Sequence, residues 1–197
     1  MSELLPTEFE TFRKIPRLSR VCVITEKIDG TNAQILVTED GKLYAGSRSR
    51  WLVTPEDESL SSDNFGFGRW ALEHKEELIK GLGIGRHYGE WWGAGIQRKY
   101  GLKEKRFSLF NTSIWNDPTV RPACCSVVPL LYEGIFSTEK VEEWVLTLRV
   151  EGSRAAPGFM NPEGVVVYHV AAGQYFKKTL EKDEEPKGLS QTQSSVE

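Results

Sequence analysis

The stretch Glu26-Lys27-Ile28-Asp29-Gly30-Thr31-Asn32 follows directly on an apolar run at residues 21–24. The β-branched residues of that run predict a strand that carries the lysine at its end. A carboxylate follows two residues later and a flexible glycine comes next, which places the lysine for attack on a phosphate. Amines do this when burial and neighbouring cations hold them neutral. A K-x-D-G pattern alone occurs often by chance, so its meaning depends on the sequence downstream.

The composition is that of one ordinary globular domain. The chain has 197 residues, of which 39% are apolar and 27% charged. No apolar run approaches the ~20 residues that a membrane-spanning helix needs, so no membrane partner is expected. The N-terminus lacks the basic start and apolar core of a secretory signal. Three cysteines without a C-x-x-C pair favour a reducing, cytoplasmic or otherwise intracellular setting and argue against a zinc site.

The charge balance limits how the chain could hold nucleic acid. The net charge is −3, so binding would need a local basic patch and not an overall positive field. A run of this kind is most often a solvated face, but it is the best candidate for contact with an RNA backbone. The candidate patch contains Arg98, Lys99, Lys103, Lys105 and Arg106.

Short strands dominate the expected secondary structure, with helices between them and no alternating βαβ series, which predicts an α+β fold. Ser137 or Thr138 could cap the second helix, and Gly81 is expected to end the first. Residues 1–187 are expected to form one domain, and residues 188–197 a disordered tail. Strands are expected at 21–27, 33–38, 43–46, 87–92, 106–114, 164–170 and 174–178, and helices at 67–80 and 138–150.

Gly81-Leu82-Gly83-Ile84-Gly85 is the most glycine-rich stretch and suggests a phosphate-binding loop. It lacks the G-x-x-x-x-G-K-[ST] pattern and follows a predicted helix, whereas such loops precede one. We therefore interpret it as a helix C-terminal cap and turn.

Gly89-Glu90-Trp91-Trp92-Gly93 places a carboxylate beside two tryptophans in a predicted strand. Its glycines allow a ligand to approach the backbone closely, and a glutamate can accept bonds from a pair of ribose hydroxyls. A half-buried strand with Glu90 turned outward explains the same pattern. In Phe107-Ser108-Leu109-Phe110, the alternation puts Ser108 and Phe110 on one face, where Phe110 is either core or a stacking platform for a base.

Two further segments put charges at strand ends. Glu163 lies on a turn directly before the apolar strand that starts at Gly164, where a carboxylate suits a hard cation, although this segment taken alone favours a solvated turn residue. Lys177 and Lys178 are neighbours near the end of the last strand and therefore point to opposite faces. One could enter a site, or both could be ordinary edge-strand lysines that discourage aggregation.

Taken in chain order, these pieces resemble the covalent nucleotidyltransferases, which include ATP-dependent DNA and RNA ligases and mRNA capping enzymes. The segments GEWWGAGIQRKYG, EGVVVYH and YFKKTLE look most like the ATP-dependent RNA ligase branch, in a minimal form with the adenylyltransferase domain only. The resemblance implies an α+β nucleotidyltransferase (ATP-grasp-like ligase core) fold with mostly antiparallel sheets and a few flanking helices. The ordered motifs are Lys27-x-Asp29-Gly30, Ser47-Arg48, Gly89-Glu90, Phe110, Glu163-Gly164-Val165-Val166 and Lys177.

The resemblance implies three catalytic residues and a metal ligand. Lys27 would be the nucleophile that takes AMP from ATP as a lysyl phosphoramidate, and Asp29 would order the site around it. Lys177 would contact the AMP phosphate. Glu163 would serve Mg²⁺ (or Mn²⁺). The implied activity is ATP-dependent, AMP-forming ligation of RNA 3′-hydroxyl and 5′-phosphate ends.

The resemblance also implies a set of residues that hold the nucleotide. Glu26 would fix the adenine edge, and Phe110 would stack on the adenine. Glu90 would hold the ribose hydroxyls, and Arg48 the ribose or the phosphate end. Lys177 would grip the phosphate, with Lys178 as a further cation beside it.

The sequence departs from the family pattern at three places. Asn111 stands where relatives often have aspartate, Tyr168 where many have a basic residue, and Thr179 where many have a second lysine. Lys178 or Lys182 could compensate for Thr179. The alternatives are a ligase of DNA or mixed nicks, a capping guanylyltransferase, or a nucleotide- or RNA-binding module that needs a protein partner for ligation.

Overall fold

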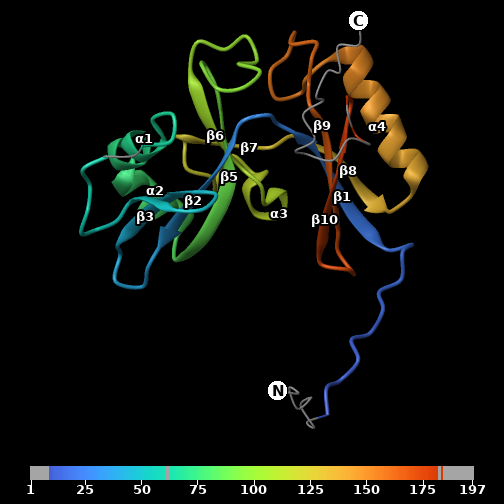
Figure 1. Ribbon diagram of the computed structural model, residues 1–197, viewed down its shortest axis with the longest axis horizontal. Helices are drawn as coiled ribbons and strands as arrows, with labels where there is room; N and C mark the ends of the chain where they lie inside the picture. Colours follow the sequence, from blue (N-terminus) through green and yellow to red (C-terminus); the bar gives the residue numbers. More distant parts are fainter. Residues whose placement is uncertain (1–8, 61–62, 182, 184–197) are drawn as a thin grey trace, which may run out of the picture.

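The computed structural model describes residues 9–60, 63–181 and 183. Two sheets lie side by side, with most of the helical residues on their outer sides (Figure 1). The strand orders are β10-β9-β1-β8 in the four-stranded sheet and β4-β3-β2-β5-β6-β7 in the six-stranded sheet. The β6–β7 pair is parallel, whereas the other strand pairs within the described ranges are antiparallel. The predicted tail at 188–197 lies outside the described residues.

The elements have the following bounds. The four-stranded sheet contains β1 (Val21–Lys27), β8 (Leu130–Ile135), β9 (Gly164–His169) and β10 (Gln174–Thr179). The six-stranded sheet contains β2 (Thr31–Val37), β3 (Leu43–Ser47), β4 (Trp51–Val53), β5 (Gly85–Gly93), β6 (Lys105–Leu109) and β7 (Cys125–Val127). The helices are α1 (Phe67–Glu73), α2 (Lys75–Leu82), α3 (Thr112–Trp115) and α4 (Thr138–Glu151).

Each sheet buries one face under helices. Val145 and Leu148 of α4 pack on the four-stranded sheet, against apolar residues of β1 and β9. Phe67 of α1 and Leu78 of α2 pack on the six-stranded sheet. A smaller cluster around Trp92 joins the two sheets where the chain passes from β1 to β2. Because the helices cover the outer faces, polar residues in or next to β1, β5 and β9 are left at the junction of the two sheets.

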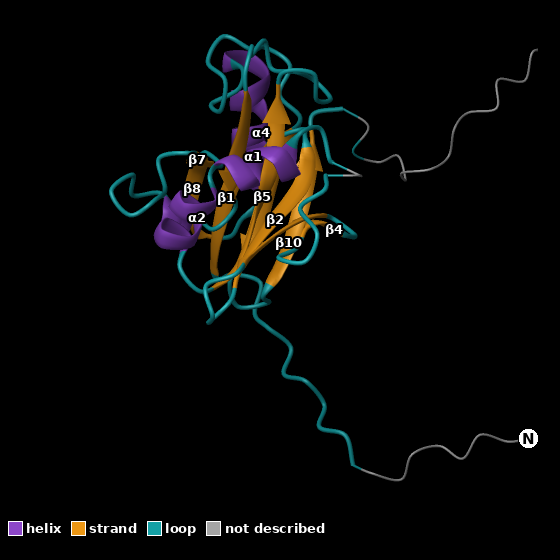
Figure 2. Ribbon diagram, turned by 90° about the vertical axis from the view of Figure 1, so that its left-hand side faces the viewer, coloured by secondary structure: helices purple, strands orange, loops and turns teal. Residues whose placement is uncertain are grey.

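Residues 9–20 form no helix or strand, and most of this stretch extends away from the sheets (Figure 2). Just before β1, the carbonyls of Leu18 and Arg20 are hydrogen-bonded to the His169 ring and the Phe136 amide. Within the described ranges, no helix combines the length and the apolar character that crossing a membrane would require.

Most predicted elements are present, and the prediction for the second helix is confirmed closely. Helix α4 spans Thr138–Glu151, and the Ser137 side chain accepts a hydrogen bond from the Lys140 amide as its N-cap. The first predicted helix is instead two helices that are interrupted at His74. Its predicted stop is also displaced, because α2 continues through Gly81 and is capped by Gly83 at φ 72°. A Cβ on Gly81 would lie 2.7 Å from a side-chain carbon of Pro122, which explains a glycine inside the helix.

The predicted strand at 106–114 is wrong in its second half. Strand β6 ends at Leu109, and the chain then forms the short helix α3. The Asn111 carbonyl accepts hydrogen bonds from the amides of Ile114 and Trp115, which closes a helical turn. Strands β4, β7 and β8 were not predicted, because they are short or only partly buried.

Candidate active site

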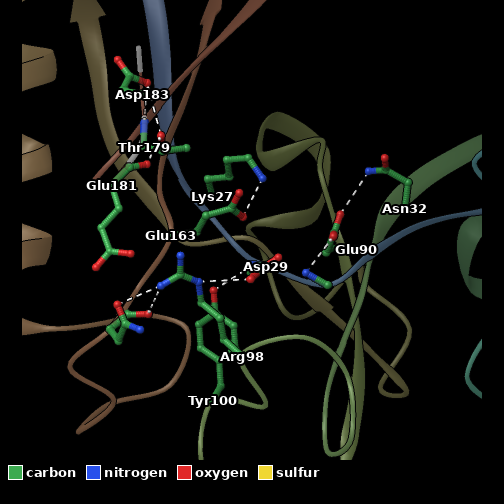
Figure 3. A network of polar contacts seen from close by, with 12 residues as sticks. Lys27, Asp29, Asn32, Glu90, Arg98, Tyr100, Glu163, Thr179, Glu181 and Asp183 are labelled. Atoms are coloured by element: carbon green, nitrogen blue, oxygen red, sulfur yellow. Dashed lines mark hydrogen bonds and ion pairs between the residues drawn. The ribbon is translucent and has the colours of Figure 1, made fainter. Parts of the chain in front are cut away.

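Lys27 ends β1 and pairs across the sheet with Gly164 of β9. Glu163 directly precedes that glycine, so the sheet register brings its side chain to the lysine. Lys27 Nζ donates a hydrogen bond to Glu163 Oε2 at 2.6 Å, and the side chains are 21% and 13% exposed (Figure 3). The predicted nucleophile and the predicted metal ligand therefore form one partly buried ion pair.

Asp29 is held on the other side of this pair by the loop between β5 and β6. Its amide donates to the Tyr100 hydroxyl at 2.8 Å, and its carboxylate accepts from Arg98 Nε at 3.1 Å. Arg98 Nη1 also donates to the Asn161 carbonyl and side-chain oxygens at 3.1 and 2.8 Å. Burial raises the pKa of the Tyr100 phenol, which keeps the hydroxyl protonated. Arg98 thus ties the Asp29 turn to the segment that precedes Glu163 (Figure 3).

Glu90 lies on β5 opposite Asn32 of β2. Its carboxylate accepts from the Gly30 amide at 3.0 Å and from Asn32 Nδ2 at 3.1 Å. Burial raises the pKa of Glu90 to about 7, although Lys27 and the Gly30 amide oppose that rise. A Cβ on Gly30 would lie 2.5 Å from the Trp91 carbonyl oxygen, so this close packing requires glycine. Glu90 therefore fixes the turn that follows Lys27.

The two lysines of β10 point to opposite faces, as their spacing predicts. Lys177 pairs with Val166 and lies on the face away from α4, which is also the face of Lys27. Lys178 Nζ forms an ion pair with Glu142 of α4 at 2.6 Å. Lys178 therefore contacts the helix on the far face, which argues against the predicted role of Lys178 in binding the cofactor.

Glu26 also faces away from Lys27. Its carboxylate accepts from Ser153 Oγ at 2.5 Å and from the amides of Arg154 and Ala155 at 2.7 and 2.9 Å. The residue is 1% exposed, and burial raises its pKa. These contacts hold the loop after α4 and argue against the predicted contact between the Glu26 carboxylate and adenine. The sequence contained the signal, because Glu26 is in phase with the buried residues Cys22 and Ile24.

Phe110 and Arg48 lie at strand ends of the six-stranded sheet. Phe110 follows β6, is 36% exposed, and shares the face of Ser108, which pairs across the strands with Glu90. This position is compatible with the predicted stacking role. Arg48 is exposed in the turn after β3, one residue beyond the pair that Ser47 forms with Ala33. Their roles stay predictions.

The basic run does not form the single patch that its sequence suggests. Arg98 is turned inward to Asp29, Lys105 Nζ donates to the Phe65 carbonyl at 2.6 Å, and Arg106 pairs with Glu104. Lys99 and Lys103 are exposed. The site contacts of Asn32, Tyr100 and Asn161 were not predicted. Asn32 closes the stretch that contains Lys27, and Tyr100 lies in the segment GEWWGAGIQRKYG, so both positions carried a sequence signal.

The residues present suit a divalent ion only if waters and nucleotide phosphates supply part of its coordination. Within the described ranges, no group of three or more histidine, cysteine, aspartate or glutamate side chains could hold a metal ion. Mg²⁺ commonly takes one or two carboxylates, several waters and substrate phosphates. The partly exposed Glu163 carboxylate fits such a site.

Two mainly antiparallel sheets, with a strand-end lysine and three carboxylates between them, define a nucleotidyltransferase-type domain. The family model described as RNA ligase matches residues 20–179. The chain therefore belongs to the RNA ligase family, and the predicted α+β fold is confirmed.

Solved structures of RNA ligase from Naegleria gruberi share this fold. A variant with ATP and manganese matches at 18% identity and a TM-score of 0.59, covering 83% of this chain and 51% of the other. A variant with AMP and manganese also has 18% identity and a TM-score of 0.59, covering 86% and 53%. This chain thus spans about half the length of those ligases. Among curated proteins, no sequence matches this one.

Proposed function

We propose that this chain is the adenylyltransferase domain of an ATP-dependent RNA ligase, which joins 3′-hydroxyl and 5′-phosphate ends through a lysyl-AMP intermediate. The observation that carries the proposal is the ion pair between Lys27 and Glu163, with Glu90 buried on the adjoining sheet. RNA ligase family membership is consistent with RNA as substrate.

The reaction would proceed through three displacements. The neutral Lys27 amine attacks the α-phosphorus of ATP, a P–N bond forms, and the bond to pyrophosphate breaks. An oxygen of the RNA 5′-phosphate then attacks the same phosphorus, and the P–N bond breaks to regenerate the amine. Finally the 3′-hydroxyl attacks the activated 5′-phosphate, loses its proton and releases AMP. Each step depends mainly on alignment and charge neutralisation.

The ion pair implies how the first step would start. As an ammonium, Lys27 has no lone pair for attack, so it must lose both a proton and its contact with Glu163. Glu163 would become a ligand of Mg²⁺ or Mn²⁺, which neutralises phosphate charge when bound. Lys27 would then be left facing the phosphate, with Lys177 on the same sheet face to grip the AMP phosphate. The solved relatives with ATP or AMP and manganese support this choice of cofactor.

The six-stranded sheet would bind the nucleoside. Phe110 would stack on adenine, Glu90 would accept from the ribose hydroxyls, and Arg48 would contact the ribose or phosphate. A carboxylate has lone pairs beyond those that Gly30 and Asn32 use, so Glu90 can accept a further bond.

The second candidate is a nucleotide- or RNA-binding module that requires a partner for ligation. The coverage of about half of the solved ligases favours keeping this alternative. Incubation with labelled ATP, followed by a chase with nicked substrates of all four RNA and DNA strand compositions, separates the proposals. We expect a labelled protein that passes AMP to RNA 5′-phosphates. Labelling with GTP alone would indicate a capping enzyme, and preferential sealing of DNA ends would indicate a DNA ligase.

A further inference from the structure

Two tyrosines, one exposed and one half-buried, form an aromatic pair on the sheet that carries Lys27. Tyr168 of β9 and Tyr175 of β10 lie directly opposite each other in the strand register. Their ring centroids are 4.5 Å apart with an interplanar angle of 34°. Tyr175 is 67% exposed. The rings thus form one continuous aromatic surface on the β9–β10 hairpin, in which Tyr175 is exposed and Tyr168 is half-buried.

The strand register places this surface on the face of the site. Val165 and Val167 of β9 pack with α4, so Tyr168, the residue after Val167, points to the other face. On β10, Lys178 pairs with α4, so Lys177 and Tyr175 share that other face. Strand spacings place the Cα atoms of Tyr175 and Lys27 ~16 Å apart, with Lys177 between them.

The charges around the tyrosine rings favour a base over a phosphate as the group that contacts them. The cations Lys177 and Lys27 lie along the strands from the tyrosines, towards the Gly164 end of β9. Across the strands, the row of Tyr175, Tyr168 and Val23 ends at the exposed Glu133 of β8. A phosphate is attracted to the lysines and repelled by the glutamate. An uncharged base can stack on the rings themselves, because every base has a π-face.

We propose that Tyr168 and Tyr175 form a base-stacking subsite for single-stranded RNA, a few nucleotides from the end that Lys27 activates. This inference rests on the proposed ligase function.

A purely structural role makes different predictions. Cross-strand aromatic pairs stabilise hairpins without any ligand. In that case, substitutions would lower thermal stability and leave RNA affinity unchanged. Phe176 supplies a matched control, because it is on the same strand, is 57% exposed, and points to the opposite face.

The test compares Tyr175→Leu, Tyr175→Phe, Tyr168→Leu and Phe176→Leu in the full chain. Affinity is measured by fluorescence anisotropy with a 5′-phosphorylated single-stranded oligoribonucleotide. We expect the Tyr→Leu variants to bind about tenfold more weakly, with an unchanged salt slope, because stacking and not charge is lost. Tyr175→Phe and Phe176→Leu should bind like the wild type. On an oligonucleotide with abasic sites near its 5′ end, Tyr175→Leu should also match the wild type.

Unchanged affinity in the Tyr→Leu variants, or equal losses in Phe176→Leu, would overturn the subsite. A thermal melt identifies any variant that fails to fold. In that case the wild type alone is compared on intact and abasic oligonucleotides, because binding to a stacking site must weaken when the bases are absent. Self-adenylylation with ATP is measured in parallel. A wild type that does not self-adenylylate would contradict the ligase function. A wild type that self-adenylylates but binds intact and abasic RNA equally would contradict only the subsite.

Discussion

Lys27 Nζ lies 2.6 Å from Glu163 Oε2, although the two residues are 136 positions apart in the chain. The β1–β9 register produces this contact, because Lys27 is opposite Gly164 and Glu163 is the next residue. The contact occupies the Lys27 side chain at the strand end. Under the proposed mechanism, the amine must separate from Glu163 before it can attack ATP.

Glu163→Gln tests this dependence on Glu163. The substitution removes the ion pair and a charged oxygen ligand, so we expect weaker binding of the divalent ion by about 10- to 100-fold. Self-adenylylation should then need correspondingly more Mn²⁺ or Mg²⁺. The measurement is a titration of lysyl-AMP formation against metal concentration at fixed ATP. An unchanged metal requirement would remove Glu163 from this role.

Arg98→Ala tests whether Arg98 positions Asp29 or contacts RNA. Its guanidinium joins Asp29 to Asn161, and small displacements near reacting groups can cost up to about 100-fold in rate. We expect self-adenylylation, measured without RNA, to fall by about tenfold or more. Lys103→Ala is the control, because Lys103 belongs to the same basic run and is exposed; it should adenylylate normally. If Arg98→Ala also adenylylates normally and only binds RNA more weakly, the original RNA-contact prediction is correct for Arg98.

Glu90 makes the stability of the fold depend on pH. Its pKa rises from 4.5 to about 7 on folding, so the folded state binds the proton more tightly than the unfolded state. This contribution to stability is complete below pH 4.5 and is lost as the pH rises through about 7. The full loss corresponds to about 3 kcal/mol. Urea denaturation from pH 4 to 8 should show this decline in the wild type and a smaller one in Glu90→Gln. Parallel pH profiles would contradict the raised pKa.

Glu26→Ala separates a structural role from adenine binding. The substitution leaves Ser153 and the amides of Arg154 and Ala155 without their acceptor, at about 1–3 kcal/mol for each buried group that stays unsatisfied. We expect a lower midpoint in urea and, in the folded fraction, an unchanged preference for ATP over GTP. If instead that preference collapses while stability is retained, Glu26 reads the adenine edge as first predicted.

Local patterns predicted much of the fold. The apolar run before Lys27 predicts strand β1 from local sequence alone. In the same way, the apolar periodicity and the N-cap residue Ser137 predict helix α4. The sequence failed where tertiary contacts decide the outcome. Strand β8 is recognisable mainly through its pairing with β1, and the glycine inside α2 is explained only by its packing against Pro122.

The candidate site was predictable to a similar degree. The resemblance selected Lys27, Asp29, Glu90 and Glu163, and the structure brings these residues together. It did not indicate on which face each side chain lies. Alternate residues of a strand point to opposite faces, so Glu26 and Lys178 point towards the face that α4 covers. Their orientation can be predicted once the buried face of the sheet is known. Arg98 looked like part of a surface patch because its partners, Asp29 and Asn161, are distant in sequence.

The most direct measurement is peptide mapping of the protein after incubation with ATP and Mn²⁺, comparing the wild type with Lys27→Ala. We expect AMP on the peptide that contains Lys27 in the wild type, and no covalent AMP in a folded Lys27→Ala variant. AMP attached to a different residue, or undiminished labelling of Lys27→Ala, would contradict the account.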